Sequence, residues 1–228
     1  MRVLAIDTAL EACAAAVLDT ARGEVVARET KPMARGHAEA LMPLVKRVVE
    51  RSGFGFSDLS RIAVTVGPGS FTGLRVGIAA ARGLALATGK PALGLTTLAA
   101  FAAPLIAEDD TSPVVAAVDA RHDHVYLHII GPGGRTLVSP KLASLRDALR
   151  ACTTSRAPRL VGNAAALLAA NWPARERQPA SIHQQAAPDI DWVAQLGAAA
   201  PESAGPPRPL YLRAPDAQPQ DASQIARR

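Results

Sequence analysis

The chain has 228 residues, which is enough for one domain or two small ones with a sizeable buried core. No apolar segment reaches the ~20 residues that a membrane-spanning helix requires, and the first residues lack the regions of a secretory signal, so we expect a cytoplasmic protein without a membrane partner. The net charge of +5 would permit contact with RNA, but the basic residues are scattered and aromatic residues make up only 4%.

The first half of the chain alternates strand-like and helix-like segments, which is typical of an α/β domain. Gly53 and Gly89 are natural stops for the two longest helices. The elements expected are strands at 2–6, 14–18 and 24–29, a helix at 36–51, a strand at 62–66, a helix at 71–88, a strand at 92–95 and a helix at about 97–107.

A similar but weaker series follows the acidic, proline-bearing break at residues 108–113. Its first strand is followed by Asp119, as the first strand of the chain is followed by Asp7. We expect strands at 114–118, 124–130 and 135–138, a helix at 142–151, a strand at 159–161, a helix at 164–170, irregular chain over 171–189 and a last helix at about 191–200. The predicted division is a first lobe at 1–107, a reduced second lobe at 108–213 and a disordered Pro/Gln/Ala-rich tail at 214–228.

A glycine-rich segment, residues 67–77, lies between the strand at 62–66 and the helix at 71–88. Its glycines let the backbone turn tightly, and the free N–H groups of a helix N-terminus attract phosphate. The same glycines would let a helix pack closely on a sheet and on a partner. Because the Lys-Ser/Thr of a Walker loop and the Rossmann spacing are both missing, we favour the packing interpretation over a phosphate cradle.

Five segments occur in the order in which one protein family carries them. They read LAIDTA at 4–9, RGHAEALMP at 35–43, GPGSFTGLRVG at 67–77, DAR at 119–121 and PLYLR at 209–213. Together with the duplicated β-β-β-α-β-α-β-α layout, they resemble the TsaB (YeaZ) family. The resemblance implies an α/β fold of the duplicated actin/Hsp70/sugar-kinase-like (ASKHA) type, with two lobes of which the second is reduced.

The resemblance also implies a function in tRNA modification. It suggests a non-catalytic relative of the transferase TsaD, which it joins as a heterodimer through the first two helices. That machinery puts threonylcarbamoyl on adenosine 37 of tRNAs that read ANN codons, with TsaE as an ATPase partner. On this view tRNA is contacted through the complex, ATP or ADP and metal sit on partner subunits, and the chain alone forms a homodimer.

The residues themselves favour a subunit without catalytic groups of its own. TsaD-like enzymes carry a metal-binding H-x-x-x-H at the start of the third helix, whereas residues 96–103 here read TTLAAFAA and offer no metal ligand. The sequence also gives no convincing Ser/His/Asp or Cys/His set. We therefore assign no catalytic residue, no metal site and no cofactor to this chain.

The rival hypothesis is a nucleotide-binding small-molecule kinase or ATPase of the same fold. Its weak candidates for cofactor binding are Asp7, Gly69 and Gly162. Asp7 could hold a hydrated Mg²⁺, and Gly162 lies at the family's adenosine-contacting turn. The turn after the first strand lacks glycine, however, and Glu11 would repel phosphate if it faced inward. A third hypothesis, direct RNA binding, predicts salt-sensitive tRNA affinity without TsaD.

Three histidines, His122, His124 and His128, alternate along one expected strand and would share a face. A metal site there would lack a carboxylate or thiolate to complete it. Cys13 and Cys152 have no paired spacing, which indicates buried thiols.

The first two helices carry more apolar surface than one sheet requires. The helix at 36–51 has two adjacent apolar stripes spanning roughly 160°, where ~100° suffices to cover a sheet. The helix at 71–88 is apolar nearly all round. Either these helices are deeply inserted, or they pair with two helices of a partner. We favour a partner interface formed by His37, Leu41, Leu44, Val48, Arg75, Ala79, Arg82 and Leu86.

Overall fold

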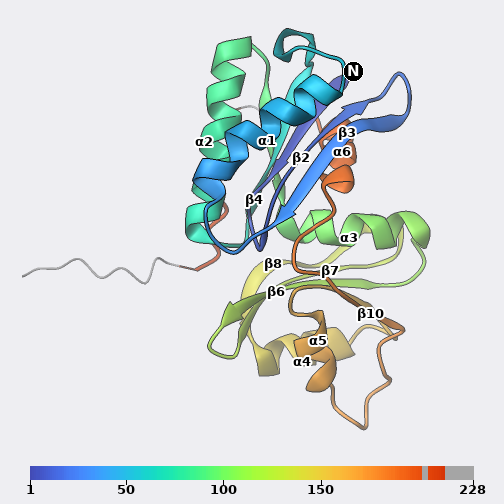
Figure 1. Ribbon diagram of the computed structural model, residues 1–228. Coiled ribbons are helices and arrows are strands. Elements are labelled where there is room, and N and C mark those ends of the chain that lie inside the picture. Colours follow the sequence, from blue (N-terminus) through green and yellow to red (C-terminus); the bar gives the residue numbers. More distant parts are fainter. Residues whose placement is uncertain (202–204, 214–228) are drawn as a thin grey trace, which may run out of the picture.

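The computed structural model describes residues 1–201 and 205–213, which form two lobes, one above the other in Figure 1. Each lobe contains a five-stranded mixed sheet. The strand order is β3-β2-β1-β4-β5 in the first lobe and β8-β7-β6-β9-β10 in the second. In both sheets the first three strands are antiparallel and the last two run parallel to the first. The expected duplicated α/β fold of actin/Hsp70/sugar-kinase type is confirmed.

The first lobe has its elements in the expected order. They are β1 (Arg2–Asp7), β2 (Ala12–Asp19), β3 (Glu24–Pro32), α1 (His37–Arg51), the short helix η1 (Phe56–Asp58), β4 (Arg61–Gly67), α2 (Phe71–Thr88), β5 (Ala92–Thr96) and α3 (Thr97–Glu108). Ser70 and Thr96 begin α2 and α3 because their hydroxyls accept hydrogen bonds from the amides of Gly73 and Ala99. Gly89, in the left-handed region at φ 66°, ends α2.

The second lobe repeats the series. Its elements are β6 (Val114–Arg121), β7 (His124–Ile130), η2 (Pro132–Gly134), β8 (Thr136–Ser144), α4 (Leu145–Thr153), β9 (Arg159–Gly162), α5 (Ala165–Ala170), β10 (Ser181–Gln184) and α6 (Ile190–Ala199).

Two expectations for the second lobe are wrong. The helix expected from 142 begins at Leu145, because the Ser144 hydroxyl caps it and Leu142 still pairs with Tyr126 in the sheet. The segment expected to be irregular over 171–189 contains β10, which pairs in parallel with β9 at the sheet edge. β10 is the second lobe's equivalent of β5.

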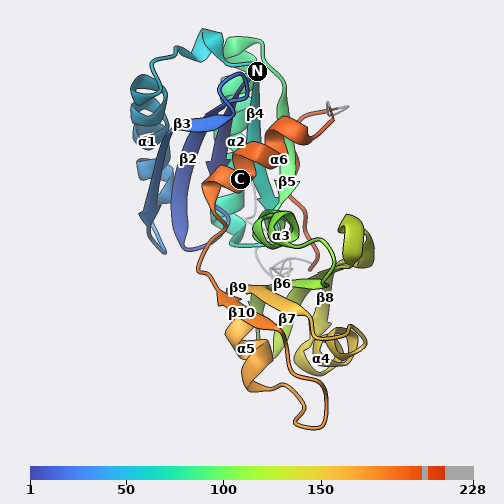
Figure 2. The ribbon, with the colours of Figure 1, turned by 90° about the vertical axis from the view of Figure 1, so that its right-hand side faces the viewer.

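Helices cover both faces of the first sheet (Figure 2). Leu4 and Ile6 of β1 lie in the core with α1 and α2, whereas the alternate residues Val3 and Ala5 pack against α6. Small side chains let α6 lie very close, since a Cβ on Gly197 would be 2.4 Å from the Cβ of Ala63.

The third helix of each lobe packs on the sheet of the other lobe. α3 contributes Leu98 and Phe101 to a buried cluster with Val114 and Val118 of β6. α6 contributes Val193 to the cluster on the first sheet. Although we expected the second lobe to span 108–213, α6 therefore lies on the first lobe. The expected tail at 214–228 lies outside the described residues.

Candidate functional site

Asp7 lies at the carboxyl end of β1 and is fully buried. Its Oδ1 accepts hydrogen bonds from the Thr65 hydroxyl and, at 3.2 Å, from the Ala9 amide. Its Oδ2 has no hydrogen-bond partner among the described residues. Burial raises the pKa of the Asp7 carboxyl to about 6, although the hydrogen bond from Thr65 lowers it in part. A Mg²⁺ ion could reach this carboxylate only if the surrounding chain moved.

The turn after β1 is covered by the N-terminal half of α2. The Thr8 hydroxyl donates to the Gly73 carbonyl at 2.7 Å, and the Ser70 amide donates to the Ala9 carbonyl at 2.7 Å. A Cβ on Gly69 would be 2.3 Å from the Ala9 carbonyl oxygen, and one on Gly73 would be 2.1 Å from that of Thr8. These glycines are required for close packing, and the N-terminal half of α2 fills the space beside this turn.

Gly162 has the matching role in the second lobe. It ends β9 with φ 113°, and a Cβ there would lie 2.1 Å from the Ala117 carbonyl oxygen of β6. The next residue, Asn163, accepts a hydrogen bond from the Asp119 amide at 2.8 Å. Steric need thus accounts for Gly162, as it does for Gly69.

The α1 residues that we predicted to form an interface face the core of the first lobe instead. His37, Leu41, Leu44 and Val48 are buried, and the last three are at most 1% exposed. Both apolar stripes of α1 are inserted into the first lobe's core because the helix packs on β2, β3 and α2 at once. The His37 ring nitrogen Nε2 lies 3.1 Å from the Leu10 carbonyl oxygen.

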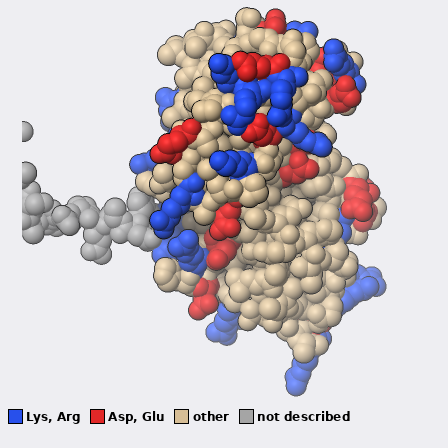
Figure 3. Space-filling model, in the orientation of Figure 1, with Lys and Arg blue, Asp and Glu red and all other residues tan. Residues whose placement is uncertain are grey.

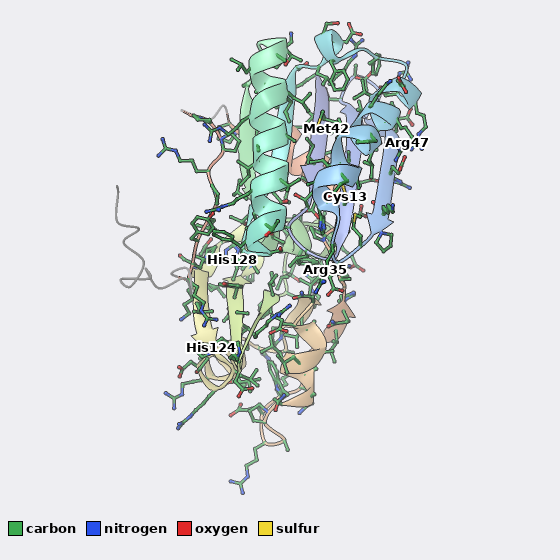
Figure 4. All side chains as sticks on the ribbon, turned by 60° about the vertical axis from the view of Figure 1, so that its left-hand side comes forward. Cys13, Arg35, Met42, Arg47, His124 and His128 are labelled. Atoms are coloured by element: carbon green, nitrogen blue, oxygen red, sulfur yellow. The ribbon has the colours of Figure 1, made fainter. Side chains whose placement is uncertain are left out.

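The outer face of α1 is mostly charged. Glu29 of β3 forms ion pairs with Arg47 and, at 3.2 Å, with Arg51 of α1, and the hydrogen bond from Arg47 lowers the pKa of Glu29. A mixed blue and red patch lies over the region of α1 and β3 in Figure 3. Met42 is the large apolar exception on this face, at 44% exposed, and Figure 4 labels it beside Arg47.

The residues predicted on α2 do reach the surface. Arg75, Ala79, Arg82 and Leu86 are all exposed, and Leu86 is 88% exposed. Their spacing of three or four residues places them on one side of the helix, together with Phe71. We call these five residues the α2 face.

Sequence analysis missed one partner of this face, Tyr211, which comes from the end of the described chain. Its ring stacks on Phe71 with centroids 5.5 Å apart, and its hydroxyl accepts a hydrogen bond from Arg75 Nε at 3.2 Å. The Arg75 guanidinium also lies 3.7 Å above the Phe71 ring. The PLYLR segment offered a signal, because an aromatic residue between prolines and arginines is unusual in a chain so poor in aromatics.

A hollow of about 480 Å³ adjoins the other end of the α2 face. It is lined mainly by apolar and small residues, namely Gly83, Ala85, Leu86, Pro91, Ala92, Gly205, Pro206 and Pro207, with Arg82.

The histidines of β7 and the turn before it do not converge. His122 lies in the turn, and its carbonyl oxygen is 2.6 Å from His124 Nδ1. His128 is buried, which lowers its pKa, and its ring nitrogens have no partner among the described residues. Figure 4 shows His124 and His128 at separate heights on the second lobe. Over residues 1–201 and 205–213, no group of three or more His, Cys, Asp or Glu is placed to hold a metal, and no helix is long and apolar enough to cross a bilayer.

A family model described as TsaD, tRNA N6-adenosine threonylcarbamoyltransferase, matches residues 24–160. The chain is 42% identical over 127 residues to the tRNA threonylcarbamoyladenosine biosynthesis protein TsaB of Escherichia coli strain K12, over 55% of this chain and 53% of that protein. It is 33% identical over 219 residues to an uncharacterized protein of Mycobacterium tuberculosis strain H37Rv, over 95% and 94% of the two chains. The chain spans about half the length of the curated TsaB relatives that it matches.

Two solved structures from Pseudomonas aeruginosa have the same fold. YeaZ superposes with a TM-score of 0.74 at 26% identity, covering 92% of this chain and 99% of that one. A second protein, described as similar to the peptidase YEAZ, gives a TM-score of 0.79 at 28% identity, covering 93% and 99%.

Proposed function

The chain belongs to the TsaB (YeaZ) family, and from this membership we propose that it is a non-catalytic subunit in tRNA threonylcarbamoyladenosine biosynthesis. In this proposal it binds the transferase TsaD as a heterodimer, TsaE joins the larger complex, and tRNA is contacted through the assembly. ATP or ADP and metal are held by the partner subunits, and the complex works in the cytoplasm.

One observation carries the proposal, namely that the two faces of α2 have different tasks. The glycine face closes the turn after β1, where an enzyme of this fold would hold phosphate. The opposite face leaves Leu86 and Phe71 exposed beside two arginines. An apolar surface of this kind on a helix is typical of a protein interface rather than of a free surface.

The kinase or ATPase hypothesis has weaker support. Of its three candidates, Gly69 and Gly162 are accounted for by packing, and Asp7 is enclosed. Calorimetry of the purified chain with ATP and Mg²⁺ separates the two hypotheses. We expect no binding tighter than ~10 μM and no turnover, whereas tighter binding together with turnover would favour the enzyme.

The interface itself is tested by reconstitution with TsaD. The variant Ala79→Asp with Leu86→Asp places two carboxylates on the exposed α2 face, so we expect loss of TsaD binding and of tRNA modification with a normal melting temperature. The control is Leu137→Asp, a partly exposed leucine of β8 in the second lobe. If the double variant binds TsaD and supports modification normally, the α2 face is not the interface.

The buried stripe of α1 needs a separate experiment. Leu41→Asp with Leu44→Asp introduces two carboxylates into the core, so we expect an unfolded chain rather than a selective loss of TsaD binding. Met42→Asp alters the exposed side of the same helix and should leave the fold intact. Weaker TsaD binding by this variant would extend the interface to α1.

A further inference from the structure

We propose that the α2 face (Phe71, Arg75, Ala79, Arg82 and Leu86) binds an acidic, partly apolar helix of a different protein and disfavours a second copy of this chain. This inference rests on the proposed function, because it specifies the chemistry of the TsaD-type partner. It is carried by the charge around α2, by the way Arg75 is held, and by the hollow beside Leu86.

α2 and the segments that flank it in the sequence are cationic and lack acidic residues. The sequence contains no Asp or Glu between Leu59 and Ala107, and none between Gly205 and Arg213. Among the described residues, neither Arg75 nor Arg82 forms an ion pair, whereas the arginines of α1 pair with Glu29. The two guanidinium groups on this face are therefore available to carboxylates from another molecule.

Arg75 is held in a fixed position before any partner binds. Its guanidinium lies on the Phe71 ring, and its Nε donates to the Tyr211 hydroxyl. An arginine that is already ordered loses less conformational entropy when it pairs with a carboxylate. Exposed Arg, Tyr and Phe side chains are also the types enriched at the centres of protein interfaces.

The opposite end of the face favours a protein over a nucleic acid. There, Leu86 projects beside the apolar hollow of about 480 Å³, which is lined in part by Pro91 and Pro207. Phosphate groups would gain nothing from this surface, but an apolar side chain of a helix would fill it. Arg75 and Arg82 are seven residues apart, so a facing helix would need carboxylates about 10 Å from one another.

A second copy of this chain would meet like charges. Two α2 helices crossing antiparallel at the small residue Ala79 would put Arg75 of each copy beside Arg82 of the other. Two-fold symmetry repeats this repulsion at both ends of the contact. A homodimer through α2 therefore has a penalty that a partner with acidic residues avoids.

The test compares heterodimer and homodimer affinities at 50 mM and 500 mM NaCl, using the full chain and purified TsaD from the same source. For the heterodimer, we expect affinity to fall by about tenfold at the higher salt concentration, because opposite charges attract less when screened. Arg75→Glu with Arg82→Glu should weaken the heterodimer by at least about tenfold. Arg146→Glu, at an exposed position of α4, should leave the affinity unchanged.

The affinity of the homodimer should respond to salt and to the single charge substitutions in the opposite direction. This experiment needs no TsaD. Sedimentation should show a wild-type homodimer that strengthens with salt. Either single variant, Arg75→Glu or Arg82→Glu, should tighten it at low salt, because Glu then meets Arg at both ends. The double variant should weaken it again. Arg82→Glu is the safer single variant, since Arg75 also contacts Phe71 and Tyr211.

Each outcome supports or overturns the inference. A heterodimer that is insensitive to salt and to both substitutions overturns it and leaves the proposed function standing. Absence of a heterodimer with wild-type chain overturns the proposed function, and the homodimer series then decides whether the charges act as proposed. Binding of tRNA by the wild-type chain alone, lost in the double variant, would make this face an RNA surface and overturn the inference.

Discussion

The Thr8 hydroxyl donates a hydrogen bond of 2.7 Å to the Gly73 carbonyl oxygen and so joins the turn after β1 to the first turn of α2. The bond forms because the helix has no side chain at Gly73, where a Cβ would lie 2.1 Å from the Thr8 carbonyl oxygen. The helix backbone also comes close to Thr8 four residues later, at Gly77, which lies beside the Thr8 hydroxyl. The glycines thus bring α2 onto β1 and leave its far side exposed.

Gly73→Ala should destabilise the protein by about 1–3 kcal/mol, because the obstacle is backbone that cannot rotate away. The melting temperature should fall by about 2–10 °C in thermal unfolding followed by circular dichroism. Gly83→Ala, on the same helix, is the control. A Cβ there meets nothing within 4 Å, so helix propensity should stabilise the protein by up to about 1 kcal/mol. Equal effects of the two substitutions would show that close packing at Gly73 is not needed.

Local sequence signals predicted most of the fold. The helix expected at 71–88 has those bounds, since Ser70 caps its start and Gly89 ends it. Most first-lobe strands were placed within a few residues because their apolar runs are bounded by turns. β10 gave no such signal, since it is a short edge strand whose alternate side chains are exposed and which is ordered only by pairing with β9.

Tertiary contacts decided what the sequence left open. The two stripes of α1 are compatible with a deep position or with a partner, and only the packing of α1 on β2, β3 and α2 shows that Leu44 is core. The position of α6 on the first sheet depends on contacts between residues more than a hundred positions apart. Tyr211 joins the α2 face through a contact of the same long-range kind, with Phe71.

Arg159 is predicted to stabilise the junction between α3 and the second lobe. Its buried guanidinium donates to the carbonyls of Leu105, Asp109 and Ser112 at the C-terminal end of α3. Arg159→Leu leaves these carbonyls without the donor and should lower the free energy of unfolding by about 2–4 kcal/mol, measured in urea. Hydrogen exchange should also speed up over residues 105–112.

The control for this substitution is Arg156→Leu, which removes an exposed arginine from the same approach to β9. It should change the unfolding free energy by less than about 0.5 kcal/mol. If Arg159→Leu is equally mild, the carbonyls have found other donors and the guanidinium is not the main support of the α3 terminus.

Both cysteine thiols should be unreactive until the protein unfolds. Cys13 and Cys152 are fully buried, and burial raises their pKa to about 11 and about 12. At pH 8, iodoacetamide should label neither residue in the native protein and both in concentrated urea, as mapped by peptide mass spectrometry. Rapid native labelling of one cysteine would identify the sheet face that opens locally.

Asp7→Asn should stabilise the protein at neutral pH and less so in acid. The folded-state pKa of Asp7, about 6, lies above the ordinary value of 3.8 because the carboxyl is buried, so the folded protein disfavours the charged carboxylate. The folded protein favours the protonated carboxyl. The stability that this preference contributes is complete below pH 3.8 and is lost as pH rises through 6. Asparagine keeps an oxygen for Thr65 and Ala9 and carries no charge.

The measurement is the difference in unfolding free energy between Asp7→Asn and wild type at several pH values. This difference should move in favour of the variant by about 2–3 kcal/mol between pH 4 and pH 7 and then stay level. That energy corresponds to the difference between the folded-state pKa of about 6 and the ordinary value of 3.8. Asp119→Asn, at the exposed equivalent position of the second lobe, is the control. A difference that does not change with pH would mean that Asp7 titrates normally, and that a counter-charge or water reaches its Oδ2.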